Sequence, residues 1–544
     1  MIPRVLWWVC VCTTLVIGSA FGAVDSRPNI VLIMADDMGF SDVGSYGGEI
    51  HTPSIDRLAT NGLRFTQFYN AARCCPTRAS LLTGLYPHQA GIHHMVDNQK
   101  LPLEKRQLSR SAVTIAEVLG RNGYRTAMSG KWHVCPVPAA STNSPTQRGF
   151  EKFYGIIHGA SSYYAPVTLR RDDAPINAPG TNYLITDAIA ENAADYIRDF
   201  SKGPEPFFVY VAFTAPHWPL HAPEEDVAKY TNTYARGWDA LRQERHERQI
   251  KMGIIDRKTG LTPRDSRVRS WAEVKNPAWE AARMAVYAAQ VERMDRGIGR
   301  VVNALQQSGE LDNTIIMFLS DNGACAEVLG AKNEALHVPK AAPGGKPMRR
   351  GNSPDIVPGP ADTYASYGAG WANLGSTPFR AYKHWVHEGG IAAPLVVHWP
   401  KGIRLPGGIR HTTAHLIDIM ATCVEVAKAR YPSGYNGNRI QPLEGQSLIG
   451  AFNTKRFHER VLFWEHEGNR AVRKGRWKLV SKYPGAWELY DMREDRSELR
   501  NLASAKPKIV TELAALYDSW VRRAKVTDWA TLQDKEPPIT KAGS

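Results

Sequence analysis

Long apolar runs are missing from this 544-residue chain beyond its first two dozen residues. The apolar stretch near the start, from Val5 to Ile17, is shorter than the roughly 20 residues that a membrane-spanning helix needs. It follows Arg4 and precedes a group of small residues, Gly18 to Ala20. This order is typical of a secretory signal peptide, here residues 1–23, with a membrane anchor as the alternative. We therefore expect an exported protein, periplasmic or extracellular, without stable membrane insertion.

Cysteine is scarce and scattered. Two of the seven cysteines, Cys10 and Cys12, lie in the predicted signal peptide. The mature chain keeps Cys74, Cys75, Cys135, Cys325 and Cys423. Five scattered cysteines in a mature chain of this size do not make a disulfide framework, and the absence of a Cys-x-x-C pair argues against a thiolate zinc site. The odd number suggests that one cysteine has another role.

The sequence also lacks Asn-x-Ser/Thr glycosylation sites, fixed-period repeats and recognisable nucleic-acid-binding motifs. Missing glycosylation sites favour a bacterial envelope or exterior over a eukaryotic secretory route. Lys and Arg number 67 against 53 for Asp and Glu, and the net charge of +14 favours anionic partners. Acidic glycans suit an exported protein better than nucleic acid does, and solubility alone is the other explanation.

Apolar strand patterns alternate with helical patterns along most of the chain. The strand patterns lie at Asn29–Ala35, Tyr124–Met128, Phe207–Phe213, Thr314–Leu319 and Pro394–His398. The helical patterns lie at Ser54–Asn61, Arg78–Leu85, Val113–Asn122, Thr186–Phe200, Glu280–Gln307 and His415–Ala427. This alternation predicts an α/β domain with helices on both faces of a largely parallel sheet.

Three regions depart from that alternation. Residues 220–278 are polar, residues 328–378 are rich in Gly, Pro and Ala, and we expect both to be long loops that shape a site. After residue 400 the strands become short and are separated by turns. They lie at Val461–His466, Arg470–Val472, Trp477–Ser481 and Trp487–Asp491, before a helix at Ile509–Lys525. The pattern predicts a small antiparallel C-terminal unit.

Cys74 stands where a helix is predicted to begin, and Arg78 follows four residues later. A helix N-terminus and a nearby cation both stabilise negative charge, so this corner suits the chemistry of an anion. From the residues alone, Cys74 is either an activated thiolate nucleophile or a buried structural cysteine, and the structural role is the commoner one.

Two pairs of oxygen-bearing side chains close predicted strands. Asp36 and Asp37 follow the first strand, and Asp321 and Asn322 follow the strand Thr314–Leu319. Adjacent carboxylates repel each other in a low dielectric unless a cation lies between them. Hard oxygen donors suit calcium or magnesium rather than zinc. Each pair alone is equally consistent with a turn or a helix cap.

Further polar residues follow predicted strands or a basic loop. Lys131 and His133 flank a tryptophan, His217 and His221 follow the strand Phe207–Phe213, and Lys383 lies in a basic segment. A histidine at a strand end is suited to general acid catalysis, or it packs against its neighbours. Taken singly, none of these residues decides a function.

Taken together, these segments resemble a known family. Cys74-Cys75-Pro76-Thr77-Arg78, followed by Ala-Ser-Leu-Leu-Thr-Gly, resembles the signature of type I sulfatases, whose first cysteine becomes formylglycine. The other segments occur in the family's order across nearly the whole mature chain. The resemblance implies an alkaline-phosphatase-like α/β fold, a large mixed sheet flanked by helices with a smaller C-terminal antiparallel α+β domain. It also implies a catalytic sulfatase domain at 24–400 and the smaller domain at 401–544.

The resemblance implies a set of site residues. The implied ligands of one calcium ion are Asp36, Asp37, Asp321, Asn322 and the formylglycine made from Cys74. The implied catalytic residues are Cys74, Arg78, Lys131, His133, His217 and Lys383. Lys131 and Lys383 would contact the sulfate, His217 would protonate the leaving oxygen, and His133 would deprotonate the formylglycine hydrate. His221 is a weaker candidate for substrate contact.

Two positions depart from the family pattern. Val134-Cys135 replace the usual Leu-Gly, which affects a turn rather than the chemistry. The segment Ile391-Ala392-Ala393-Pro394 lacks the usual arginine, so any role of that arginine is in doubt here.

We therefore expect a sulfuric ester hydrolase that acts on aryl sulfates or sulfated carbohydrates and is matured by a formylglycine-generating enzyme. The segment Leu261–Asp265 resembles bacterial arylsulfatases. Two alternatives stay open. Because sulfate and phosphate esters share a tetrahedral geometry, a phosphodiesterase or phosphonate monoester hydrolase could use the same scaffold. An unmodified protein that binds sulfated glycans is the second alternative.

Overall fold

The computed structural model describes residues 27–137, 140–180, 182–332, 335–453 and 457–533. The predicted signal peptide, residues 1–23, lies outside the described residues. Within the described ranges, no helix has the length and apolar character needed to cross a membrane.

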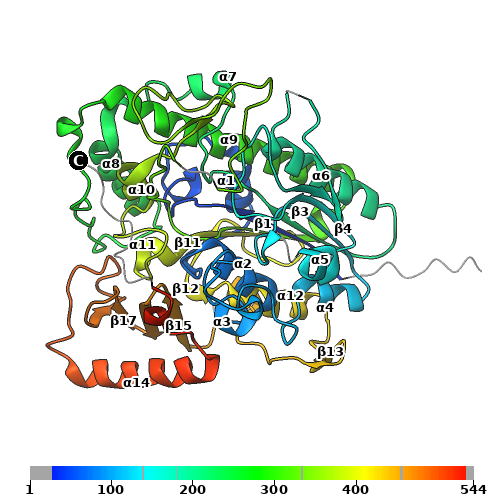
Figure 1. Ribbon diagram of the computed structural model, residues 1–544. Helices are drawn as coiled ribbons and strands as arrows, with labels where there is room; N and C mark the ends of the chain where they lie inside the picture. Colours follow the sequence, from blue (N-terminus) through cyan, green and yellow to red (C-terminus); the bar gives the residue numbers. More distant parts are fainter. Residues whose placement is uncertain (1–26, 138–139, 181, 333–334, 454–456, 534–544) are drawn as a thin grey trace, which may run out of the picture.

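A ten-stranded mixed sheet forms the centre of the molecule (Figure 1). Its strand order is β12-β2-β11-β8-β1-β7-β3-β4-β5-β6. The strands are β1 Asn29–Ala35, β2 Leu63–Tyr69, β3 Arg125–Lys131, β4 Lys152–Ile156, β5 Leu169–Arg171, β6 Ala174–Pro175, β7 Phe207–Ala212, β8 Thr314–Ser320, β11 Ala392–His398 and β12 Gly408–His415. The central strand β1 pairs in parallel with β7 and β8 and is buried along its length, as its continuous apolar sequence requires.

Helices cover both faces of this sheet (Figure 1). One face carries α1 Pro53–Thr60, α6 Ile185–Phe200 and α9 Pro277–Gln307, and the other carries α2 Cys74–Thr83, α4 Ile115–Arg121 and α12 Ile417–Val426. In α6, buried residues recur at Ile185, Ile189, Ala193 and Ile197, one turn apart, which gives this helix one apolar face. The prediction of a large mixed α/β sheet flanked by helices is confirmed.

The prediction of a long loop at 220–278 is wrong in part. This stretch contains α7 Glu224–Ala228 and α8 Gly237–Lys251. Helix α8 is rich in Arg, Gln and Glu, which favour helix without giving a wide apolar stripe, so its periodicity is weak. The stretch 328–378 has little regular structure: β9 Arg349–Arg350, β10 Thr363–Tyr364 and α10 Gly368–Gly375.

A four-stranded antiparallel sheet forms the predicted C-terminal unit (Figure 1). It consists of β15 Val461–His466, β16 Asn469–Lys474, β17 Trp477–Ser481 and β18 Glu488–Asp491. Helix α14, Pro507–Ala524, packs on it, and Trp520 stacks on Phe463 with ring centroids 5.2 Å apart. The remaining short elements are α3 Pro87–Ala90, α5 Ala140–Asn143, α11 Glu388–Ile391, α13 Ile449–Asn453, β13 Gly434–Tyr435 and β14 Asn438–Arg439. The domain boundary at residue 400 stays a prediction.

Buried charged groups connect the C-terminal sheet to the large sheet. Lys478 Nζ on β17 lies 2.9 Å from Glu388 Oε1 and 2.8 Å from Glu498 Oε1. Glu388 Oε2 also accepts from the Tyr69 hydroxyl on β2 at 2.8 Å. All four side chains are buried, so this network requires both units to be in place.

Candidate functional site

The two oxygen-bearing pairs predicted from the sequence meet at the carboxyl ends of β1 and β8. Their parallel register pairs Ala35 with Ser320, so the residues that follow lie side by side. The Asn322 amide donates to Asp37 Oδ1 at 2.6 Å, and the backbone N–H of Asp37 donates to Asp321 Oδ1 at 3.0 Å. Ligand sites of α/β sheets commonly lie at this edge.

These side chains have the oxygen atoms that a divalent cation needs. Asp36 Oδ1 and Asn322 Oδ1 are buried and have no hydrogen-bond partner among the described residues. Burial and the neighbouring charge of Asp321 raise the pKa of Asp36 well above its usual value. A cation between the carboxylates would pair with the unpartnered oxygens and offset the repulsion between Asp36 and Asp321. Without it, each buried acceptor that lacks a partner costs about 1–3 kcal/mol. The residues therefore fit a hard cation such as calcium.

Cys74 occupies the first turn of α2, and only 2% of its surface is exposed. Arg78 lies one turn further along the helix and is also buried. Its guanidinium donates to Asp321 Oδ2 at 3.0 Å and to the Lys131 carbonyl at 2.9 Å. The Cys75 thiol, His133 and Lys131 lower the pKa of Cys74 well below its usual value, despite burial. The corner therefore stabilises negative charge, as the sequence predicted.

Two lysines supply further positive charge. Lys131, the last residue of β3, donates to Asp36 Oδ2 at 2.6 Å. Lys383 donates to Asp37 Oδ2 at 2.9 Å and to Glu327 Oε2 at 3.2 Å. With Arg78, the lysines place three cationic side chains against the three carboxylates of Asp36, Asp37 and Asp321, and all six are buried.

Two buried histidines complete the group. His217 Nε2 lies 3.3 Å from Asp37 Oδ2, while its Nδ1 donates to the Trp218 carbonyl at 2.6 Å. Neither ring nitrogen of His133 has a hydrogen-bond partner in the described part of the chain. Burial lowers the pKa of His217 to about 3 and that of His133 to about 4. Both rings are therefore neutral at pH 7 before a ligand binds.

All ten predicted site residues come together at this sheet edge: Asp36, Asp37, Cys74, Arg78, Lys131, His133, His217, Asp321, Asn322 and Lys383. His221 differs, because both of its ring nitrogens face backbone groups. Its Nε2 donates to the Thr363 carbonyl at 2.6 Å, and its Nδ1 accepts from the Tyr163 N–H at 3.3 Å. His221 therefore has no ring nitrogen left for a substrate.

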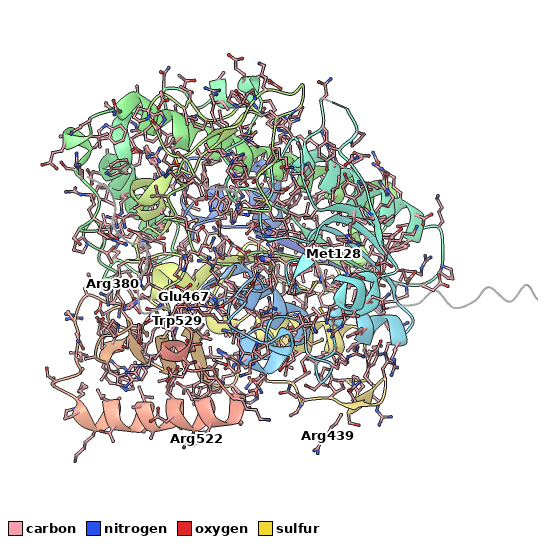
Figure 2. All side chains as sticks on the ribbon, in the orientation of Figure 1. Met128, Arg380, Arg439, Glu467, Arg522 and Trp529 are labelled. Carbon is pink, nitrogen blue, oxygen red and sulfur yellow. The ribbon has the colours of Figure 1, made fainter. Side chains whose placement is uncertain are left out.

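No sequence pattern predicts Glu327, which links several residues of the site. It accepts from Lys383, pairs with Arg73 at 3.1 Å and accepts from Trp218 Nε1 at 2.7 Å. The adjacent His384 lies 2.9 Å from Glu467 at the tip of the β15–β16 hairpin, where the two sheets meet (Figure 2). Glu327 lies in an irregular segment without periodicity, so only the fold brings it here.

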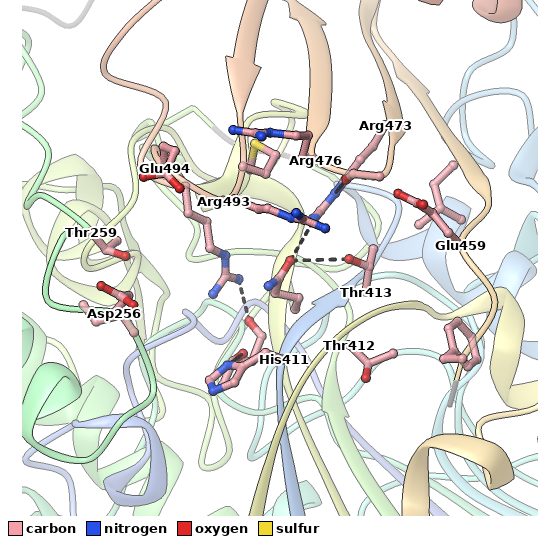
Figure 3. Close-up of a pocket in the computed structure, with 18 of the residues that line it drawn as sticks. Asp256, Thr259, His411, Thr412, Thr413, Glu459, Arg473, Arg476, Arg493 and Glu494 are labelled. Atoms are coloured by element: carbon pink, nitrogen blue, oxygen red, sulfur yellow. Dashed lines mark hydrogen bonds between the residues drawn. The ribbon is translucent and has the colours of Figure 1, made fainter. Parts of the chain in front are cut away.

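A cavity also lies away from the site residues, between the β2–β12 edge of the sheet and the C-terminal unit (Figure 3). It has a volume of about 760 Å³ and is lined by residues that include Arg473, Arg476 and Arg493. None of the ten site residues lines it. The contacts around the strand ends, rather than cavity size, therefore identify the candidate site.

A family model described as sulfatase matches residues 28–429. The chain belongs to the sulfatase family. A second model, described as the C-terminal part of N-sulphoglucosamine sulphohydrolase, matches residues 379–519. An uncharacterized sulfatase of Schizosaccharomyces pombe is 35% identical, and the alignment covers 90% of this chain and 93% of that relative. An arylsulfatase of Klebsiella aerogenes is 32% identical, with 79% of this chain and 93% of the relative covered.

Solved structures show the same fold. A structure named Ps i-CgsB, in complex with k-i-k-neocarrahexaose, has a TM-score of 0.66 at 24% identity and covers 92% of this chain and 94% of its own. A structure in complex with D-glucosamine-2-N,6-O-disulfate has a TM-score of 0.61 at 20% identity, covering 92% and 99%. As a sulfatase with arylsulfatase relatives, the protein is a sulfuric ester hydrolase.

Proposed function

We propose that this sulfatase hydrolyses sulfate esters with a formylglycine made from Cys74 and one calcium ion held by Asp36, Asp37, Asp321 and Asn322. The observation that carries the proposal is the pair of buried, unpartnered oxygens, Asp36 Oδ1 and Asn322 Oδ1, beside the buried Cys74. When bound, calcium would offset the negative charge of the sulfate group and orient it.

A formylglycine hydrate at position 74 would supply one hydroxyl that attacks sulfur as the alcohol leaves, and a second whose deprotonation would expel the sulfate and restore the aldehyde. Lys131, Lys383 and Arg78 would hold the sulfate oxygens, since their cationic groups already surround the carboxylates at 2.6–3.0 Å. Preorganised charge of this kind stabilises the transition state without reorganisation.

His217 and His133 are suited to two different proton transfers, one to the leaving oxygen and one from the second hydroxyl of the formylglycine hydrate. Because His217 Nδ1 donates to the Trp218 carbonyl, its Nε2 is the nitrogen that would serve the leaving oxygen. A bound sulfate ester brings negative charge beside both rings, which raises the pKa of an imidazole. His133, whose nitrogens have no described partner, would receive the proton of the second hydroxyl.

The substrate is an aryl sulfate or a sulfated carbohydrate. The Klebsiella aerogenes relative is named an arylsulfatase, and one solved relative in fold binds a disulfated glucosamine. We also propose export to the periplasm or exterior, after maturation by a formylglycine-generating enzyme.

The test is hydrolysis of 4-nitrophenyl sulfate and of bis(4-nitrophenyl) phosphate, with calcium and with a chelator. The protein is co-expressed with a formylglycine-generating enzyme, and Cys74→Ala is the control. We expect sulfate release that requires calcium and is lost in Cys74→Ala. Preference for the phosphate diester would replace the proposal with a phosphodiesterase. No turnover of these esters or of monosaccharide sulfates, despite an aldehyde confirmed at position 74 by mass spectrometry, would contradict it.

A further inference from the structure

Five rings form a continuous arc from His217 to His133. The ring centroids of His217 and Trp218 are 4.4 Å apart, and Trp218 and His337 are 5.2 Å apart. His337 and His158 follow at 5.2 Å, and His158 and His133 at 6.2 Å. The leaving oxygen is proposed to lie at His217, so the rest of the departing alcohol would lie along this arc.

The five rings come from four separate segments, and the three rings between His217 and His133 lie in segments that are each held by a hydrogen bond or ion pair. Trp218 follows β7 and donates from Nε1 to Glu327 at 2.7 Å. His158 follows β4, and its Nε2 lies 3.4 Å from Asp97 Oδ2. His337 comes from the 328–378 segment, and its carbonyl accepts from the Tyr364 hydroxyl at 3.2 Å. These contacts hold the rings of the arc in defined positions.

The arc contains polar atoms that have no partner. Both ring nitrogens of His337 are buried without a hydrogen-bond partner among the described residues. Asp97 pairs with His158 through Oδ2, while 51% of its side chain stays exposed and able to accept. A neutral imidazole offers one donor and one acceptor, which suits a hydroxyl group. A purely apolar ligand would leave the buried His337 nitrogens unpaired, at about 1–3 kcal/mol each.

We propose that Asp97, His158, Trp218 and His337 form the subsite for the alcohol side of the ester and that this subsite takes a sulfated carbohydrate in preference to a simple aryl sulfate. Trp218 offers an aromatic face for the C–H face of a sugar ring, while His337 and Asp97 pair with its hydroxyls. This inference rests on the proposed function, because His217 fixes which end of the arc the ester oxygen occupies.

The expected discrimination is large. A site whose buried polar groups pair with substrate hydroxyls rejects an analogue that lacks them, by up to about 10⁴–10⁵ in kcat/KM. Here the buried ring nitrogens of His337 and the charged, half-exposed carboxylate of Asp97 together predict at least about 100-fold.

The experiment compares kcat/KM for 4-nitrophenyl sulfate with kcat/KM for a panel of monosaccharide sulfates, namely glucosamine 6-sulfate, galactose 6-sulfate, galactose 4-sulfate and fucose 2-sulfate. The variants are Asp97→Asn and His337→Phe, which keep the size of the side chain but remove its charge or its ring nitrogens. His458→Ala, an exposed histidine outside the arc, is the matched control. Mass spectrometry measures the formylglycine content of each protein.

We expect at least one monosaccharide sulfate to exceed 4-nitrophenyl sulfate in kcat/KM by about 100-fold. Asp97→Asn should lower the saccharide value about 10- to 100-fold, and His337→Phe about 10-fold. Both should lower the saccharide-to-aryl ratio, while His458→Ala leaves it unchanged.

Two outcomes would overturn the inference. One is turnover of 4-nitrophenyl sulfate without turnover of any saccharide on the panel. The other is an equal fall for both substrates in Asp97→Asn and His337→Phe, which would indicate a structural role. Failure of the proposed function is distinguishable, because it removes turnover of every sulfate ester from protein that carries formylglycine.

Discussion

Glu327 contacts several side chains around the site, among them Lys383, Trp218 and Arg73. Its carboxylate accepts from Lys383 and Trp218 and pairs with Arg73. Burial raises the pKa of Glu327, but Lys383 and Arg73 lower it well below its usual value, so the carboxylate is charged. Lys383 is thus held between Glu327 and Asp37, which fixes the position of its ammonium group.

Glu327→Gln should therefore impair the site while leaving the fold intact. Without the charge, Lys383 keeps its ion pair with Asp37 and a weak contact with Cys325 Sγ at 3.7 Å, and the ring of Trp218 loses a charge-assisted bond. We expect kcat/KM for 4-nitrophenyl sulfate to fall about 10-fold or more, since one charge-assisted hydrogen bond contributes about 1.5–3 kcal/mol. Glu224→Gln, at an exposed glutamate, is the control. Equal kcat/KM in the two variants would refute this role.

At the scale of the elements, two glycines allow the strands β3 and β4 to approach each other closely. Gly130 on β3 pairs with Gly155 on β4, one residue before Lys131. A Cβ at Gly155 would lie 1.8 Å from the Gly130 carbonyl oxygen, and its φ of 153° also disfavours a side chain. The close approach of these two strands therefore sets the position of Lys131.

Gly155→Ala should force β3 and β4 apart. We expect a loss of more than about 3 kcal/mol in the free energy of unfolding, or insoluble protein, because backbone atoms cannot move aside cheaply. Gly309→Ala is the matched control, since Gly309 also has a positive φ of 73° but no atom within 4 Å of its Cβ position. That control should lose only about 1–2 kcal/mol. Urea unfolding measures both, and similar losses would count against the close approach.

How far the sequence predicts these elements depends on burial. β1 was predicted to the residue because it is apolar on both faces, whereas the edge strand β12 has a polar sequence and was missed. The ten candidate site residues are predicted from short motifs. Nine of them meet at one edge because they follow strands of the same direction, and Lys383 joins them because it precedes the antiparallel strand β11. Glu327, Asp97 and His337 lie in irregular segments, so only tertiary contacts bring them to the site.

At the scale of the whole molecule, the buried network around Lys478 links the two sheets. Burial raises the pKa of Glu388, but Lys478 and Arg496 together lower it to about 2. The folded pKa is below the unfolded value, so Glu388 stabilises the fold above about pH 4.5. That contribution is lost as the pH falls from about 4.5 towards 2.

Lys478→Met should remove the cation that two buried carboxylates, Glu388 and Glu498, share, and leave Glu388 with Arg496. We expect a loss of about 3–5 kcal/mol in the free energy of unfolding at pH 6. The difference from the wild type should shrink towards pH 3, where Glu388 is protonated more readily in the variant. Lys474→Met removes an exposed pair with Glu512 and should cost less than about 1 kcal/mol. Urea unfolding across this pH range tests the expectation, and a pH-independent difference would contradict it.

The burial of Cys74 has a consequence for timing. Every residue of α2 is buried, and a modifying enzyme needs physical access to the side chain that it oxidises. The proposed conversion to formylglycine must therefore finish before the strands around it close, while the chain is still an open polymer. A molecule that folds first keeps its thiol for as long as it stays folded. The active fraction of this sulfatase would then depend on the rate of Cys74 oxidation relative to the rate of folding during synthesis.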